Sequence, residues 1–387
     1  MTLQISNDMP ELVALRRFLH QNPELGLSEF KTSDFIADQL TQMGWEVTRG
    51  LAKTGIVATL RNGSSDRAIG IRADIDALPI FEETGLDHAS QTPGLMHACG
   101  HDGHTAILLG AAKALSERRN FDGAVHLIFQ PAEENFAGAK IMIEDGLFKR
   151  FPCDVVFGLH NDPSIPFGKI AVKEGPMMAA ADECLIVVNG RGGHGAEPQD
   201  ALDPIVCGAS IVMALQTIVT RNLHAMDQAV ITVGAFNSGK ASNVIPERAE
   251  LAVTIRSFDP KVRDMLETRV REVAEGQAAS YGMSATIHYE RGYEPTINHV
   301  EQTQFIRSVA QRVVGTENVL DLPRPSMGSE DFAFMLAETP GSYILLGTGR
   351  TDRDPPLHHP KFDFNDDALP IGVSMWVETV EAYLKND

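Results

Sequence analysis

The sequence predicts an α/β protein in two parts, a three-layer αβα domain interrupted by a smaller α+β sandwich. Three observations support this fold class. The chain has 387 residues, more than one ordinary core holds. Its two outer parts alternate short β-rich segments with helical patterns, as layered α/β domains do. The stretch between them, residues 181–293, has the order βαββαβ, which is that of a split βαβ sandwich.

Two helices are expected before the first strand. Residues 8–20 carry apolar side chains at helical spacing, with Asp8 placed to cap the helix and Pro10 in its first turn. A second helical pattern starts near Ser28, and Gly44 is placed to end it. The chain then changes to a strand pattern.

The first strands are the segments WEVTR, GIVATL and AIGIRADIDALP, which turn residues separate. The third contains Asp74 and Asp76, whose side chains should share one face where an α/β sheet presents its strand ends. An apolar helix, the buried strand GAVHLIFQ, a loop and helix, and the strand VVFGLH follow. His160 is expected at the end of that last strand.

The segment 181–293 is predicted to be an insertion rather than a tail. Beyond it a helix, the segment MGSEDFAFML, the strand SYILLG and a last helix resume the α/β pattern. We therefore expect residues 1–180 plus 294–387 to form one domain. Residues 181–293 should form a second, inserted domain that moves about hinges near residues 180 and 293.

Composition and charge exclude several classes of protein. The formal charge of -19, without any Lys/Arg cluster, argues against nucleic acid as a partner. No run reaches the ~18 apolar residues of a membrane span, and the N-terminus has no signal-peptide pattern. A cytoplasmic protein without a membrane partner is therefore expected. The four cysteines are widely spaced, and Cys207 should be a buried thiol.

Side chains that bind metals recur at predicted turns and strand ends. They are Cys99, His101, Glu133, Glu134, His160, His358 and His359. A site mixing thiolate, imidazole and carboxylate suits zinc, and manganese, cobalt or nickel also fit. Because these candidates exceed what one tetrahedral ion needs, we expect two divalent ions about 3.5–4 Å apart that share a ligand.

The adjacent pair Glu133 and Glu134 indicates the chemistry. Adjacent side chains on an extended loop point different ways, so one can hold a metal while the other faces a water that the metal activates. A carboxylate there can take a proton from that water and pass it to a leaving group, as amide hydrolysis requires. Two solvated acids on a loop are the alternative interpretation.

Nine motifs resemble a known family, in the family's order. They are LRRFLHQNPELGLSEFKT, IRADIDALPI, MHACGHDGHTAILLGAA, IFQPAEE, GLHNDP, GRGGHGAEP, SNVIPERAEL, GSEDF and LHHPKFDFND. The family is the amidohydrolases of the metallopeptidase clan that contains hippurate hydrolase, N-acyl-amino-acid amidohydrolases, indole-acetyl-amino-acid hydrolases and N-acetyldiaminopimelate deacetylase. The resemblance implies that residues 1–180 plus 294–387 form a zinc-peptidase-like catalytic, metal-binding domain. It also implies that residues 181–293 form a ferredoxin-like lid or dimerisation domain.

The resemblance also implies roles for individual residues. The metal ligands would be Cys99, His101, Glu134, His160 and His358. Glu133 would be the general base, and Asp74 an acid that orients a ligand from behind it, a role Asp76 could share. His358 is preferred to His359 because it matches the family's Leu-His-any-Pro pattern. His97, Asp102 and His104 would support the site.

The inserted domain would contribute substrate contacts by the same resemblance. His194 would reach the scissile carbonyl or the substrate carboxylate as an oxyanion donor does. Asn243 and Arg256 are further candidates, Arg256 because a guanidinium pairs with a carboxylate, although a surface ion pair explains it equally well. A homodimer or homotetramer would form through this domain.

The predicted function is hydrolysis of the amide bond of a small N-acyl amino acid by a metal-activated water. A dipeptidase or carboxypeptidase on the same scaffold is the alternative, since it would differ in the pocket and not in the metal motifs. A cysteine hydrolase with Cys99 as nucleophile would not need Glu134, His160 and His358. A non-enzymatic metal-binding protein would be expected to have lost Glu133.

Overall fold

The computed structural model describes residues 9–351 and 353–385. The chain divides into two compact units. Unit 1 comprises Met1–Met177, Ile297–Arg324 and Asp331–Asp387, and unit 2 comprises Met178–Thr296 and Pro325–Glu330. Asp8, the expected cap of the first helix, lies outside the described residues.

Unit 1 is built on an eight-stranded sheet with the order β1-β2-β4-β3-β5-β16-β6-β15. Strands β4, β3, β5 and β16 run parallel to one another, whereas β2 pairs antiparallel with β4 and β1 antiparallel with β2. At the other edge β6 pairs antiparallel with β16 and parallel with β15. The strands are β1 (Glu46–Leu51), β2 (Gly55–Asn62), β3 (Ala68–Asp74), β4 (Gly123–Gln130), β5 (Val155–Pro166), β6 (Ile170–Val172), β15 (Val319–Asp321) and β16 (Gly341–Gly349).

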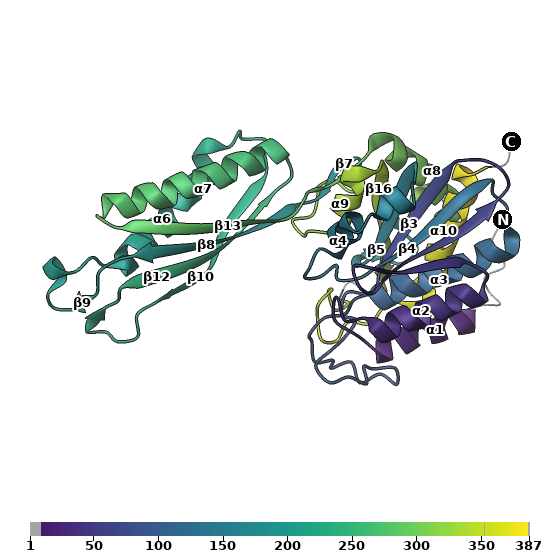
Figure 1. The fold of residues 1–387 in the computed structure, drawn as a ribbon, viewed down its shortest axis with the longest axis horizontal. Helices are drawn as coiled ribbons and strands as arrows, with labels where there is room; N and C mark the ends of the chain where they lie inside the picture. The colour runs from purple at the N-terminus through teal and green to yellow at the C-terminus, as the bar shows by residue number, and fades with distance from the viewer. Residues whose placement is uncertain (1–8, 352, 386–387) are drawn as a thin grey trace. The chain divides into compact units, whose positions relative to one another are not determined.

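Helices cover both faces of this sheet and make the three predicted layers (Figure 1). One face carries α2, α3, α8 and α10, with α1 packed on α3, and the other carries α4 and α9. The helices of unit 1 are α1 (Met9–Gln21), α2 (Phe30–Gln42), α3 (His101–Arg118), α4 (Gly138–Glu144), α5 (Leu147–Arg150), α8 (Val300–Val314), α9 (Phe332–Glu338) and α10 (Leu369–Tyr383). The predicted fold class is confirmed.

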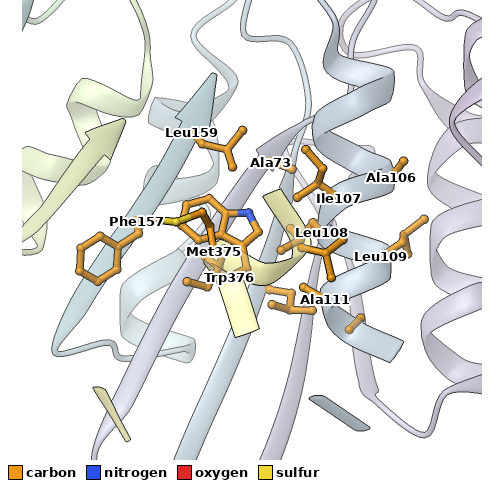
Figure 2. Close-up of a cluster of buried hydrophobic side chains, with 14 of the residues drawn as sticks. Ala73, Ala106, Ile107, Leu108, Leu109, Ala111, Phe157, Leu159, Met375 and Trp376 are labelled. Carbon is orange, nitrogen blue, oxygen red and sulfur yellow. The ribbon is translucent and has the colours of Figure 1, made fainter. Parts of the chain in front are cut away.

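The main core lies between the sheet and the α3/α10 layer. Figure 2 shows β3 and β5 contributing Ala73, Phe157 and Leu159 to it, with Trp376 of α10 among them. Helix α3 buries an unbroken run from His101 to Leu109, because it is covered by the sheet, α1 and α10. A helix buried on nearly all sides holds its first turn rigidly, and that turn carries the candidate ligand His101.

The expectation that His160 ends its strand is wrong. Strand β5 continues to Pro166, because residues 160–162 keep pairing with Leu345–Gly347 of β16. Asp76 lies two residues beyond the end of β3. The side chains at the carboxyl edge of this sheet therefore come from strand ends, from loops and from one strand interior.

Unit 2 has a four-stranded antiparallel sheet with the order β10-β12-β8-β13 and the helices α6 and α7 packed on it. Numbered along the unit, this order is 2-3-1-4, that of the split βαβ sandwich. Its elements are β8 (Ala180–Asn189), α6 (Pro204–Thr217), β10 (Ala229–Ser238), β12 (Arg248–Ser257), α7 (Pro260–Ser280) and β13 (Ser284–Tyr293). The short strands β9 (Gly193–His194) and β11 (Val244–Ile245) pair, as do β7 (Gly175–Met178) and β14 (Thr296–Asn298).

Among the described residues, one helical segment, Pro204–Asn222, is long and apolar enough to cross a membrane by length and composition alone. A third of its most apolar window, 33%, is buried inside the protein. Cys207, Ile211 and Leu215 on its buried face belong to the core of unit 2. The packing explains the apolar character of this face, and Cys207 is the buried thiol that the sequence predicts.

Candidate metal centre

The turn before α3 sets two candidate ligands on either side of one glycine. Gly100 has a φ of +89°, a conformation that side chains other than glycine rarely adopt. A Cβ there would also lie 2.3 Å from Oδ1 of Asn161. The glycine therefore allows the chain to reverse between Cys99 and His101 while Asn161 packs against the turn.

His101 is held with one ring nitrogen available. Its Nδ1 lies 2.9 Å from the carbonyl oxygen of Asp76 and 3.2 Å from Oδ1 of that residue. Because a carbonyl only accepts, Nδ1 donates to it, and Nε2 is the nitrogen that can bind a metal once it has lost its proton. Nε2 is buried and has no hydrogen-bond partner. A metal ligand needs this arrangement, since the protonated nitrogen fixes the ring and the other binds the ion.

His160, on β5, has one ring nitrogen fixed by a backbone carbonyl, as His101 does, and its other ring nitrogen lies beside Cys99. The Nδ1 of His160 donates to the carbonyl oxygen of Asn161 at 2.7 Å, which leaves Nε2 as the unprotonated nitrogen. That Nε2 lies 3.3 Å from Sγ of Cys99. A thiolate and an imidazole nitrogen this close, on two different elements, can share one ion.

Glu134 and His358 bring the last two candidates. The backbone N–H of Glu134 donates to Oδ2 of Asp76 at 3.0 Å, so Asp76 orients both His101 and the Glu134 loop. Oε1 of Glu134 lies 3.2 Å from Nε2 of His358. His358 has a φ of +64° and donates its backbone N–H to the carbonyl of Ala98 at 2.8 Å.

The five predicted ligands fall into two trios that share Cys99. In each trio the ligand atoms lie within 4.8 Å of one another; the trios are Cys99, His101 and His160, and Cys99, Glu134 and His358. Glu133, a buried side chain, joins His101 and Glu134 in a further group. Together with the unpartnered Nε2 of His101, this mixed set of sulfur, nitrogen and oxygen donors fits divalent metal ions.

Carboxylates around His101 favour positive charge in the site. Burial by itself lowers the pKa of His101, but Asp74, Asp76 and Glu134 outweigh it and raise the pKa to about 10. Burial and the carboxylates of Glu134 and Glu133 raise the pKa of the Cys99 thiol well above its usual range. A divalent cation would compensate these carboxylates and displace the protons from thiol and imidazole, as metal binding does.

The chain is similar in sequence and fold to proteins of one known family. Residues 70–382 match the family described as Peptidase family M20/M25/M40. The chain belongs to that family. It is 42% identical to a hippurate hydrolase of Campylobacter jejuni, over 97% of both chains, and 42% identical to an N-acetyl-L-cysteine deacetylase of Bacillus subtilis, over 93% of this chain and 85% of that one. A solved structure from Bacillus subtilis, described as a dinuclear metal binding peptidase from the M20 family, superposes with a TM-score of 0.86 at 34% identity, covering 99% of this chain and 100% of that one.

As a member of peptidase family M20/M25/M40 with hydrolase relatives, the chain is a metal-dependent amide hydrolase. The resemblance stated from the sequence is thereby confirmed. Asp76 and Asp74 share the contacts behind the candidate ligands that the sequence predicts mainly for Asp74. Asp76 contacts His101 and Glu134 directly, whereas Asp74 accepts from Nδ1 of His104 at 2.6 Å and lies 3.8 Å from Nε2 of His101.

His104 is occupied on both ring nitrogens and so serves as support. Its Nδ1 donates to Asp74, and its Nε2 accepts from the backbone N–H of Asn161 at 2.9 Å. Asp102 bonds Nδ1 of His20 at 2.8 Å and pairs with Arg16 at 3.0 Å, both buried. The buried ring of His97 makes no hydrogen bond from either nitrogen, and burial lowers its pKa to about 3. The supporting role of these three residues stays a prediction.

In unit 2 the structure brings together two of the three predicted substrate contacts. His194 is exposed on β9 and pairs with Val244, next to Asn243. The backbone N–H of Ala196 donates to Nδ1 of His194 at 3.1 Å, which leaves Nε2 as the ring nitrogen that can donate to a substrate. Arg256 is at the other end of the sheet, where Nη1 donates to Oγ of Ser329 at 3.2 Å.

Sequence reasoning missed Arg72, Gln130 and Asp331. All three are buried and polar, and they hydrogen-bond to one another at the carboxyl ends of β3 and β4 and the start of α9. Two signals were available. Arg72 is a charge inside an otherwise apolar strand, and Asp331 belongs to the motif GSEDF, for which the sequence predicts no role.

Proposed function

We propose that this chain hydrolyses the amide bond of small N-acyl amino acids with two divalent metal ions, which zinc, manganese, cobalt or nickel would supply. The observation that carries the proposal is the pair of ligand trios that share Cys99. One trio would hold each ion, with Cys99 common to both trios. The proposed ligands are Cys99, His101, Glu134, His160 and His358.

The substrate class is supported by what the relatives are named for. Hippurate and N-acetyl-L-cysteine are amino acids with an acyl group on nitrogen, and the hydrolases named for them are each 42% identical to this chain. Both substrates keep a free carboxylate beside the scissile amide. A small acyl group and a carboxylate are therefore the features that we propose the site recognises.

We propose Glu133 as the general base. A bound divalent metal would lower the pKa of water and polarise the scissile carbonyl. Glu133 is buried, and one of its oxygens lies within 4.8 Å of a ligand atom of His101 and of Glu134, so this carboxylate lies beside the proposed ligands. It would then deliver that proton to the leaving amine nitrogen, acting as acid in the second half of the reaction.

The remaining contacts are proposed from unit 2, with His194 as oxyanion donor and Asn243 and Arg256 as substrate contacts. Arg248 begins β12 and Arg256 is its last residue but one, so the two lie about 26 Å apart at the usual rise per residue. One small substrate cannot span that length, and His194 lies beyond Arg248. We therefore propose a homodimer formed through unit 2, in which two copies share these contacts.

The proposed location is the cytoplasm. All four cysteines are free thiols, including Cys99, whose proposed role requires the reduced form. Reducing compartments keep thiols in that state.

The test is a substrate panel on one metal-loaded preparation. N-benzoylglycine, N-acetylcysteine and indole-acetyl amino acids are compared with dipeptides and with peptides that have a free C-terminus. We expect hydrolysis of the N-acyl amino acids, its loss on chelation, and its return with added metal. A preference for dipeptides would favour a dipeptidase, and full activity in chelator would favour Cys99 as a nucleophile; either result would contradict the proposal.

A further inference from the structure

Asp331, in the motif GSEDF, is a buried acceptor at the start of α9. Its two carboxylate oxygens each lie 2.8 Å from Nε2 of Gln130. One oxygen also accepts from the backbone N–H of Ala139 at 2.9 Å, and the other from Nη2 of Arg72 at 3.1 Å. This carboxylate therefore joins three segments that are far apart in the sequence.

Arg72 donates to Asp331 and to two further acceptors, and these hydrogen bonds form one buried network. Its side chain is fully buried on β3, where Nε donates to Oε1 of Gln130 at 2.8 Å and Nη1 to Oδ2 of Asp74 at 2.5 Å. The guanidinium carbon lies 5.8 Å from the centre of the Phe332 ring. A planar guanidinium can meet three acceptors in fixed directions, which a lysine ammonium on a flexible stem cannot.

The two partners of this network bracket the loop that carries the proposed base. Gln130 is the last residue of β4, and Ala139 is in the first turn of α4. Between them lie Glu133 and Glu134. The loop also contains two non-glycine residues in the left-handed region, Ala132 with a φ of +56° and Ala137 with a φ of +52°. Such a conformation persists only where the surroundings impose it.

Hydrogen bonds also connect the Arg72 guanidinium to β5. Asp74, its third acceptor, accepts from Nδ1 of His104, and Nε2 of His104 accepts from the backbone N–H of Asn161. Asn161 directly follows His160. A chain of three hydrogen bonds thus runs from Arg72 to the backbone beside a proposed ligand.

We propose that Arg72, with Gln130 and Asp331, forms a clamp that positions the Glu133/Glu134 loop for metal binding and proton transfer. Arg72 is a positioning residue here, because it acts through Gln130, Asp331 and Asp74. The inference rests on the proposed function in one respect, namely that Glu134 binds metal and Glu133 moves the proton. It goes beyond that function by assigning the site's geometry to residues outside the ligand set.

The test replaces Arg72 by lysine, which keeps the charge and loses the planar fork. We expect kcat at saturating metal to fall about 10- to 100-fold with KM changed little, and metal affinity to fall by a similar factor, as when partners behind metal ligands are removed. Amide hydrogen exchange in residues 131–139 should become faster. The exchange and metal-titration readouts do not depend on turnover.

The matched control is Arg263→Lys. Arg263 is equally buried and binds Asp182 through both Nε and Nη2, but all its partners lie in unit 2. It should lower stability while leaving kcat, metal affinity and exchange in residues 131–139 within about twofold of wild type. Should Arg72→Lys not fold, Asp331→Asn keeps the shape of the clamp and removes its charge, with the same expected losses.

The clamp is wrong if Arg72→Lys and Asp331→Asn both retain wild-type kcat, metal affinity and loop exchange. It is also wrong if Arg263→Lys produces the same losses, since these would then follow from any buried arginine. A wild-type protein that fails to hydrolyse N-acyl amino acids would instead contradict the proposed function. Metal affinity and loop exchange would still decide the clamp in that case.

Discussion

Two histidines in the site have the same local chemistry, and a third differs by one hydrogen bond. His101 and His160 each donate Nδ1–H to a backbone carbonyl, whereas His104 uses both nitrogens within the protein. The sequence predicts this separation from the family resemblance. It cannot predict it from spacing, because His101 and His104 lie three residues apart on one helix and differ only in what other elements bring to their rings.

Glu29 illustrates a buried carboxyl whose protonation the fold controls. Its carboxylate accepts from the backbone N–H of Ala132 at 2.9 Å and from the hydroxyl of Thr54 at 2.7 Å, and it is fully buried. Burial raises its pKa from 4.5 to about 7. The folded protein therefore holds a proton on Glu29 at pH values where the unfolded chain has released it.

This difference in pKa makes the stability of the protein depend on pH. Between pH 4.5 and 7 the folded state binds more protons at this site than the unfolded state, so the contribution of Glu29 to stability falls as pH rises through that window. Glu29→Gln does not titrate and can keep both hydrogen bonds. We expect its stability relative to wild type to increase by roughly 2–3 kcal/mol from pH 4.5 to 8. Urea unfolding at a series of pH values measures this, and a pH-independent difference would refute it.

At the scale of elements, three adjacent parallel strands assemble the site. The ends of β3 and β4 and the interior of β5 supply Asp74, Gln130 and His160 at one edge of the sheet. The apolar strands and the ligand-bearing turns were predictable from the sequence. The extension of β5 past His160 was not, because it depends on pairing with β16, which lies some 180 residues further along the chain.

Replacing glycine by alanine should lower stability where α3 and α10 touch and raise it in an uncrowded part of α7. A Cβ at Gly372 would meet three atoms of the Ile107 side chain, the nearest at 2.4 Å, whereas one at Gly276 in α7 meets nothing within 4 Å. We expect Gly372→Ala to destabilise the protein by about 1–3 kcal/mol through overpacking. Gly276→Ala should stabilise by about 0.5–1 kcal/mol, since alanine favours a helix.

Denaturant unfolding of both variants checks this pair. If Gly372→Ala proves as stable as Gly276→Ala, the helices can separate without cost, and the view that α3 holds its first turn rigidly is wrong.

At the scale of the whole molecule, the chain leaves unit 1 and returns to it. The sequence predicts an insertion here because a βαββαβ run interrupts an α/β pattern. The roles of that insertion as lid or dimerisation domain stay predictions. The acyl group and amino acid were out of reach, since the side chains that would select them carry no motif.

The predicted hinge has a direct test. We expect the angle between the units to differ between crystals grown with and without a non-hydrolysable N-acyl amino acid analogue, because closure would bring substrate contacts to the site and exclude water. Gel filtration of the same samples reports the proposed homodimer. Equal angles in both states would contradict a moving lid.

Glu133 is the residue that we propose transfers the proton in the metal-dependent amide hydrolysis. Glu133→Gln keeps the size of the side chain and removes its basicity, while the five proposed ligands remain. The measurement is kcat on N-benzoylglycine together with bound metal per chain. We expect wild-type metal content and a kcat reduced about 100- to 10 000-fold, since the variant has lost its general base. Near wild-type kcat with metal still bound would contradict it.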